Sequence, residues 1–135
     1  MSITLTPGQK KLFTEPNFGH LATLNPDGSP QVTPVWVEME GDRILVNTAE
    51  GRIKPRNVRR DPRVAISIVN HGNPYSAAWV RGRVIDIRTE GADEGIDRLA
   101  KKYIGQDKYP WRSPDEQRLI LVIEPERVGT QMVED

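Results

Sequence analysis

The pattern of apolar and polar residues along the chain predicts a strand-rich protein. Val35 and Val37 point to one side of their segment while Trp36 and Glu38 point to the other, which is the alternation of a half-buried strand. Residues 63–70 are instead apolar on both faces and β-branched, which predicts a strand buried on both sides. Six strands are predicted in all, over residues 17–25, 30–40, 43–48, 63–70, 75–88 and 118–132.

Glycine and proline indicate where these strands turn or break. The sequences NPDG at 25–28 and GD at 41–42 predict tight turns between hairpin partners. Pro34 cannot donate to a sheet ladder, so its strand is expected to lie at an edge or to break there. Gly82 is expected to mark a bulge, and Pro125 to interrupt the last strand.

Three short helices are predicted between the strands. The first covers residues 7–13, with Thr6 as its N-cap. The second starts at about residues 54–55, because a proline is tolerated only in the first helical turn, and the Asp-Pro pair at 61–62 ends it. The third covers residues 90–105 and has acidic residues early, lysines late and a glycine as its stop.

Strands in hairpin order with short helices inserted indicate an α+β fold that is mainly antiparallel. For a chain of 135 residues, a closed barrel is the natural way to remove exposed strand edges. We therefore expect a six-stranded barrel with short peripheral helices, formed by one domain over residues 1–135.

The composition excludes several classes of site and partner. The chain has no cysteine, and its two histidines, His20 and His71, show no ligand spacing for zinc, so no metal site is expected. The formal net charge of zero argues against a dedicated nucleic-acid binder. No apolar run is long enough to span a bilayer, and the N-terminus lacks a signal-peptide core, so a cytoplasmic location without membrane contact is expected.

Six Arg and Lys side chains are concentrated within residues 52–63. The loop before them joins a strand to a helix, where unpaired backbone N–H groups favour anions. Arginine suits bidentate contact with phosphate, whereas lysine acts as a movable point charge. The loop therefore predicts a site for one phosphate or phosphodiester, formed by a hydroxyl, a turn glycine and two cations: Thr48, Gly51, Arg52 and Lys54.

The remaining arginines of this cluster, Arg56, Arg59, Arg60 and Arg63, lie farther along the helix. One interpretation is a solvated helix face, balanced by the acidic residues between positions 86 and 97. A single-stranded nucleic-acid patch is disfavoured, because residues 49–64 contain no aromatic side chain for base stacking.

Two segments of the chain resemble a known family. The sequences GHLATLNPDGSPQVTPVWVE (19–38) and NTAEGRIKPRNVRRDPRVAISI (47–68) resemble the pyridoxamine 5′-phosphate oxidase-like split β-barrel flavoproteins. Within that superfamily they look most like the branch that uses the deazaflavin coenzyme F420, flavin/deazaflavin oxidoreductase B. The resemblance implies a split β-barrel and a homodimer with cofactors at the subunit interface.

The resemblance also implies which residues bind the cofactor. Strand residues 32–36 would lie beside the ring, and Thr48, Arg52 and Lys54 match the positions that hold the phosphate. Residues of the long strand would reach the partner chain's cofactor, although tryptophans there are also common as interface aromatics. The full implied set is Val32, Thr33, Pro34, Val35, Trp36, Thr48, Gly51, Arg52, Lys54, Arg56, Asn57, Trp79 and Arg81.

The implied activity is hydride transfer from reduced F420 to a small organic acceptor. Two alternatives stay open: FMN at the same phosphate site, and a cofactor-binding protein without turnover. No catalytic acid, base or nucleophile stands out, which is consistent with a cofactor that carries the chemistry. The chain ends at 129–135 without the substrate-phosphate segment of authentic pyridoxamine phosphate oxidases, so vitamin B6 oxidation is not expected.

Two features of this picture remain open from the sequence. F420 carries an anionic tail, which would give the surplus arginines Arg56 and Arg60 a ligand. Tyr109 and Trp111 lie in a loop that would either close over a substrate or fill the dimer interface.

Overall fold

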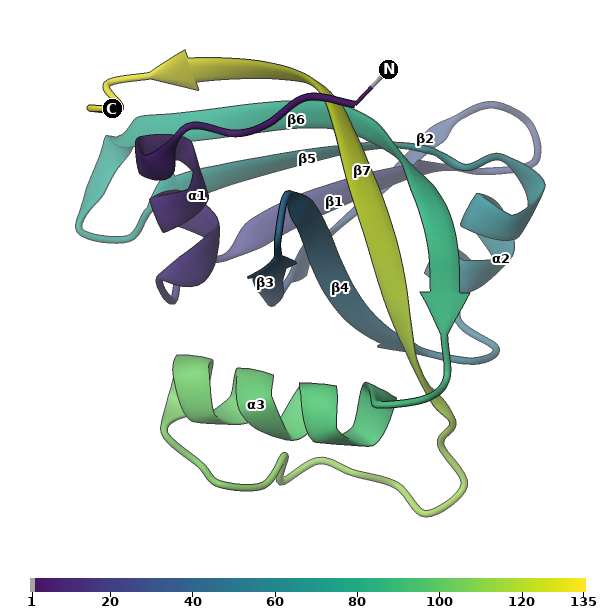
Figure 1. Ribbon diagram of the computed structural model, residues 1–135. Coiled ribbons are helices and arrows are strands. Elements are labelled where there is room, and N and C mark those ends of the chain that lie inside the picture. The colour runs from purple at the N-terminus through teal and green to yellow at the C-terminus, as the bar shows by residue number, and fades with distance from the viewer. Residues whose placement is uncertain (1) are drawn as a thin grey trace.

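The computed structural model describes residues 2–135 and has an α+β fold of three helices and one antiparallel sheet of seven strands (Figure 1). The strand order is β2-β1-β5-β6-β7-β4-β3. The strands are β1 (Gly19–Leu24), β2 (Pro30–Val35), β3 (Val37–Glu40), β4 (Arg43–Ala49), β5 (Arg63–Asn70), β6 (Asn73–Arg88) and β7 (Arg118–Gln131). The helices are α1 (Pro7–Thr14), α2 (Ile53–Arg60) and α3 (Ala92–Ile104).

The expected strand over residues 30–40 is two strands, which corrects the count from six to seven. Pro34 pairs with His20 of β1, and after Trp36 the chain pairs with β4 at the opposite edge of the sheet. Trp36 alone therefore joins the two edge strands. No hydrogen-bonded register joins β2 to β3 within residues 2–135, so the expected closed barrel is also corrected to a curled sheet that is not closed.

The helix boundaries follow the local signals. Thr6 caps α1 through a capping box with Gln9. Helix α2 begins with Pro55 in its first turn and ends at Asp61, as predicted. Helix α3 ends at Gly105, whose φ of 70° suits glycine. No helix within residues 2–135 is long and apolar enough to cross a bilayer.

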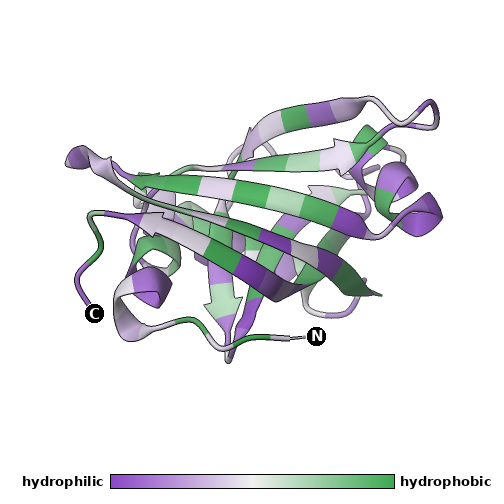
Figure 2. Ribbon diagram, turned by 90° about the horizontal axis from the view of Figure 1, so that it is seen from above, coloured by the Kyte–Doolittle hydropathy of each residue, from purple (hydrophilic) through white to green (hydrophobic). Residues whose placement is uncertain are grey.

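The main core lies inside the curl of the sheet. Leu12 and Phe13 of α1 pack there against inward side chains of the strands, such as Leu21, Ile66 and Leu121. Apolar and polar residues alternate along these strands in Figure 2. This alternation corrects one prediction: β5 is buried on one face only, because no helix or strand within residues 2–135 covers the other.

The expected bulge at Gly82 is present. The register between β6 and β7 shifts between Arg81 and Gly82, so that Arg81 faces Arg127 while Gly82 faces Pro125. Strand β7 runs through Pro125, contrary to the expected interruption, because the bulge absorbs the proline's missing hydrogen bond.

Candidate functional site

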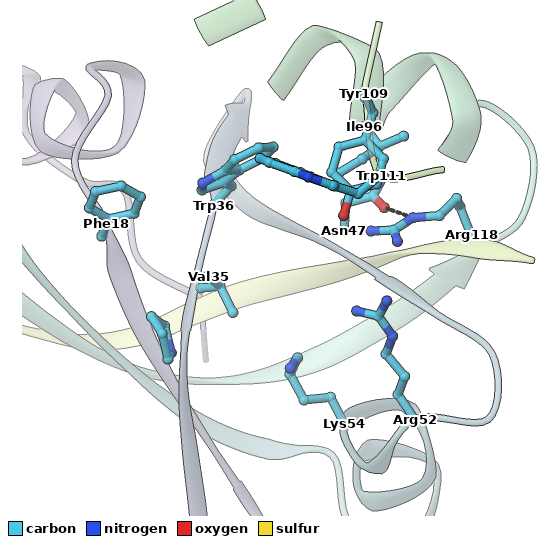
Figure 3. A pocket seen from close by; sticks show the side chains of 11 residues that line it. Phe18, Val35, Trp36, Asn47, Arg52, Lys54, Ile96, Tyr109, Trp111 and Arg118 are labelled. Carbon is cyan, nitrogen blue, oxygen red and sulfur yellow. Dashed lines mark hydrogen bonds between the residues drawn. The ribbon is translucent and has the colours of Figure 1, made fainter. Parts of the chain in front are cut away.

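A pocket of about 300 Å³ opens where the two sheet edges meet at Trp36 (Figure 3). It lies between the β2–β3 corner, the start of α2, helix α3 with the loop after it, and the start of β7. The pocket combines cations with aromatic rings, which is the composition of a site for a flat anionic ligand. Its lining residues are Phe18, Pro34, Val35, Trp36, Asn47, Arg52, Lys54, Ile96, Tyr109, Trp111 and Arg118.

Lys54 and Arg52 form the cationic wall of this pocket. Lys54 Nζ donates to Thr33 Oγ1 at 3.0 Å and forms no ion pair with any described residue. Burial, with the nearby charge of Arg52, lowers the pKa of Lys54 below its ordinary value of 10.5. A half-buried ammonium group without a carboxylate partner is electrostatically strained, and an anion bound beside it would relieve that strain.

The N-terminus of α2 points its unpaired N–H groups to the same region. Gly51 adopts a φ of 88°, which favours glycine, and lets the chain turn from β4 into the helix. Arg52 is the N-cap but makes no side-chain capping hydrogen bond, and the first turn contains no acidic residue. The helix end is therefore left for an anion to satisfy.

Trp36 is held in the pocket wall by α3. Its indole stacks on the ring of Tyr103, with centroids 5.3 Å apart and planes 5° from parallel. Tyr103 Oη accepts the N–H of Val37 at 3.1 Å and donates to the carbonyl of Asn17 at 2.6 Å. The Tyr103 hydroxyl thus bonds a backbone N–H group that has no strand partner where the chain crosses from β2 to β3.

Lys102 fixes the same corner from the neighbouring position of α3. Its Nζ donates to the carbonyls of Phe13 and Val37, at 2.7 and 2.5 Å. Burial lowers the pKa of Lys102 to about 8.

We expect this buried lysine to make stability depend on pH. The folded pKa of about 8 lies below the ordinary value of 10.5, so between these pH values the unfolded chain binds more protons and stability rises with pH. Urea unfolding at pH 8 and pH 10 should show a smaller rise in Lys102→Met than in the wild type. Lys101→Met, at an exposed lysine of the same helix, should keep the wild-type rise. An equal rise in the free energy of unfolding from pH 8 to pH 10 in the wild type and Lys102→Met would show that Lys102 does not cause the pH dependence.

Aromatic rings form the wall of the pocket opposite Lys54. Tyr109 and Trp111 make an edge-to-face pair at 5.6 Å, and both contact the Trp36 ring. Their loop is tied to α3 through Asp97, which accepts the N–H of Tyr109 at 2.9 Å and Arg112 Nη2 at 2.7 Å. Within one chain the loop therefore already borders the pocket.

Arg118, which the sequence analysis missed, completes this side of the pocket. The side chain is only 3% exposed, and its Nε donates to Asn47 Oδ1 at 2.8 Å. Its Nη1 donates to Glu116 Oε1 at 2.8 Å, while Arg52 Nη2 donates to Glu116 Oε2 at 2.9 Å. Burial alone would raise the pKa of Glu116, but the two arginines outweigh it and lower that pKa. The sequence did contain a signal for this residue, because a charged arginine begins the otherwise apolar segment RLILVI (118–123).

Part of the implied cofactor set comes together in this pocket. Pro34, Val35, Trp36, Arg52 and Lys54 line it, and Thr33 contacts Lys54.

Other residues of the implied set lie elsewhere. Thr48 is fully buried, and its hydroxyl has no hydrogen-bond partner within residues 2–135. It points to the opposite side of β4 from Asn47, which lines the pocket. Asn57 is buried and donates to Thr23 Oγ1 and Asn25 Oδ1, so it supports the β1–β2 turn.

The arginines after Arg56 are engaged by the chain itself, and Arg63, which was expected on the helix, instead begins β5. Arg59 forms a two-point ion pair with Glu50, at 2.5 and 2.8 Å. Arg63 pairs with Asp61 at 2.7 Å, and Arg60 donates to the carbonyl of Leu24. Their partners are not the acidic residues at 86–97, which corrects that expectation. Among the described residues, Arg56 is the exposed arginine of this helix that has no partner.

Val32, Trp79 and Arg81 lie on the outer face of the sheet. Cross-strand partners share a face, so the registers place side chains in lateral rows. One row runs Val32, Ala22, Ala65, Arg81 and Arg127, and the next runs Pro34, His20, Ser67, Trp79 and Gly129.

Comparison with known proteins identifies the family. The family model described as pyridoxamine 5′-phosphate oxidase matches residues 5–132. An F420 reductase is 32% identical with a TM-score of 0.80, over 93% of this chain and 98% of that one.

More distant structures share the fold. HupZ of Group A Streptococcus is 19% identical with a TM-score of 0.70, over 98% of each chain. A putative pyridoxamine 5′-phosphate oxidase from Listeria innocua is 20% identical with a TM-score of 0.63, over 84% of this chain and 86% of that one. With the fold and pocket described above, these matches show that the chain belongs to the pyridoxamine 5′-phosphate oxidase-like family, as its sequence motifs indicated.

Proposed function

We propose that this protein is an oxidoreductase that binds the deazaflavin coenzyme F420 and transfers a hydride to a small organic acceptor. The observation that carries the proposal is Lys54, a half-buried cation without a carboxylate partner, beside the uncapped start of α2. When bound, the reduced coenzyme would supply two electrons and a proton as a hydride, and the acceptor would take a second proton from solvent. The family and its F420 reductase member support the same reading.

The residues present fit such a cofactor. Lys54 and Arg52 would hold the phosphodiester, and Val35 and Trp36 would contact the ring at the β2–β3 corner. The aromatic wall excludes water from the reacting atoms, and the fixed corner aligns cofactor and acceptor. Since Arg59, Arg60 and Arg63 are engaged within the chain, the proposed contact with the anionic tail narrows to Arg56.

Titration of the purified protein with F420 and with FMN tests the cofactor. F420 should bind in the micromolar range by cofactor fluorescence, and FMN more weakly. Tight binding of FMN with no response to F420 would show that the cofactor is FMN and not F420. Oxidation of reduced F420 with any member of an acceptor panel would exclude binding without turnover, whereas no oxidation across the panel would favour it.

We also propose that the protein forms a homodimer through the outer face of the sheet. Its two lateral rows hold small side chains between Val32, which is 61% exposed, and Trp79, which is 49% exposed. Gly129 leaves no side chain under the Trp79 indole, which lies flat across it. Exposed apolar side chains such as Val32 and Trp79, beside small residues on one open sheet face, favour association.

Substitution at the centre of this face tests the dimer. Ser67→Arg should shift the sedimentation profile from dimer to monomer, while Arg43→Gln, at the start of β4, should leave it unchanged. A wild-type protein that sediments as a monomer would sink the proposal.

A further inference from the structure

Arg118 is a buried cation that the proposed cofactor contacts do not use. It begins β7, where its backbone pairs with Ala49. Asn47 and Glu116 hold its Nε and Nη1, so the guanidinium plane is fixed. The guanidinium carbon lies 5.3 Å from the centre of the Tyr109 ring. An arginine held in this way loses little freedom when it binds a further group.

One end of this guanidinium is left for a ligand. Within residues 2–135, Nη2 makes no hydrogen bond, although the side chain is only 3% exposed and lines the pocket. Nη2 is not a buried atom, so its two N–H donors face the pocket that Arg118 lines and can meet an acceptor bound there. A carboxylate is the acceptor that matches guanidinium geometry and charge.

The surroundings of Arg118 define the rest of the ligand. Tyr109 and Trp36 lie at right angles and form a corner of ring faces and edges, with Trp111 at its rim and 63% exposed. Flat conjugated groups stack well in such a corner. Figure 3 shows Arg118 beside Asn47 at the end of the pocket away from Lys54, with the guanidinium group of Arg52 between them. Arg118 therefore adds a cationic position that is separate from Lys54.

We propose that Arg118 binds the carboxylate of the acceptor, and that the substrates of this protein are flat, conjugated carboxylic acids. The inference rests on the proposed function, because it assigns Lys54 and Arg52 to the cofactor and Arg118 to the substrate. Glu116 accepts from both Arg52 and Arg118, so its carboxylate bridges the two guanidinium groups and offsets part of their charge. Asn47 and Glu116 are positioning residues for the substrate end.

The inference is tested with cinnamate and its neutral analogue cinnamamide, added to ¹⁵N-labelled protein. Shifts of the indole N–H resonances of Trp36 and Trp111 report binding in the pocket. The titrations use the Lys54→Ala background, which removes the cation of the phosphate end that has no carboxylate partner among the described residues. Cinnamate should bind at least about tenfold more tightly than cinnamamide, as expected for a charge-assisted hydrogen bond.

Arg118→Gln in the same background should remove this preference by weakening cinnamate about tenfold and leaving cinnamamide within about twofold. Arg43→Gln, at an exposed arginine outside the pocket, is the matched control. Equal affinities for the two probes before Arg118 is changed would overturn the proposal, even where Arg118→Gln does not fold. Cinnamate binding that weakens from the wild type to Lys54→Ala, and does not weaken further when Arg118→Gln is added, would also overturn it.

These outcomes are separable from failure of the proposed function. A carboxylate preference that depends on Arg118, in a protein that does not bind F420, would leave the substrate end intact and refute the cofactor assignment. F420 binding without any preference for cinnamate over cinnamamide would support the cofactor assignment and refute the role of Arg118.

Discussion

Replacing Lys54 by alanine should weaken F420 binding by about 10- to 100-fold, the usual range for a charge-assisted hydrogen bond to phosphate. Lys54 is half-buried, contacts only Thr33 and has no carboxylate partner among the described residues, so its charge is available to a ligand. Fluorescence titration of the wild type and Lys54→Ala measures the ratio of dissociation constants. The variant should fold normally, because it loses a lysine whose burial is unfavourable to the charged form.

The affinity should also depend on pH in a defined direction. Burial lowers the pKa of Lys54, and a bound phosphate would raise it again, so binding takes up protons and weakens as pH rises through the pKa of the free protein. This dependence should vanish in Lys54→Ala. Lys11→Ala, at an exposed lysine of α1, should match the wild type in both measurements. An unchanged F420 affinity in Lys54→Ala would contradict the proposal that the cofactor phosphate binds at Lys54.

Local signals were sufficient for the helices and for the position of Arg52 and Lys54 at the start of α2. Pro55 can stand only in a first helical turn, and Asp61 precedes a second proline, so the bounds of α2 were readable from adjacent residues. Arg52 and Lys54 lie within that segment. Their position beside the start of the helix needed no knowledge of the rest of the fold, and the anion that they would bind stays a prediction.

The sheet edges depended on pairing between distant segments. Pro34 signalled a break, but it carries no information that β3 joins β4 on the far edge of the sheet. The face of β5 was misjudged for a similar reason. Its outward residues Ala65 and Val69 are small or apolar, yet burial depends on what covers a strand. No element in the described part of the chain covers this face of β5.

The rest of the pocket was hidden for two physical reasons. Arg118 and Asn47 are 71 positions apart in the sequence, and only the β4–β7 pairing brings them together. Thr48 was expected in the phosphate site because it precedes Gly51, but strand alternation turns it inward while Asn47 faces the pocket. Adjacent residues of a strand point to opposite faces, so treating Thr48 as a loop residue gave no information on which face it occupies.

Replacing Gly82 by alanine should destabilise the protein by at least about 2 kcal/mol, the cost of overpacking a closed site. A Cβ atom at Gly82 would lie 2.2 Å from the carbonyl oxygen of Glu124 and 3.2 Å from Pro125 Cα. Both are backbone atoms of the neighbouring strand, so a side-chain rotation does not relieve the contact. The two strands would have to separate at the bulge, where the β6–β7 register already shifts.

The midpoint of thermal unfolding should fall by roughly 6 °C or more in Gly82→Ala, given the usual enthalpy of a domain this size. Gly72→Ala is the matched control, because a Cβ there would meet only Asn70 Oδ1 at 3.5 Å, an ordinary contact. Its midpoint should stay within about 2 °C of the wild type. Because the bulge lies between the row of Arg81 and Arg127 and the rest of β6, Gly82→Ala should also loosen the outer face of the sheet. Equal midpoints for the two variants would mean that the strands separate at no cost, and the close packing of β6 on β7 would then not determine stability.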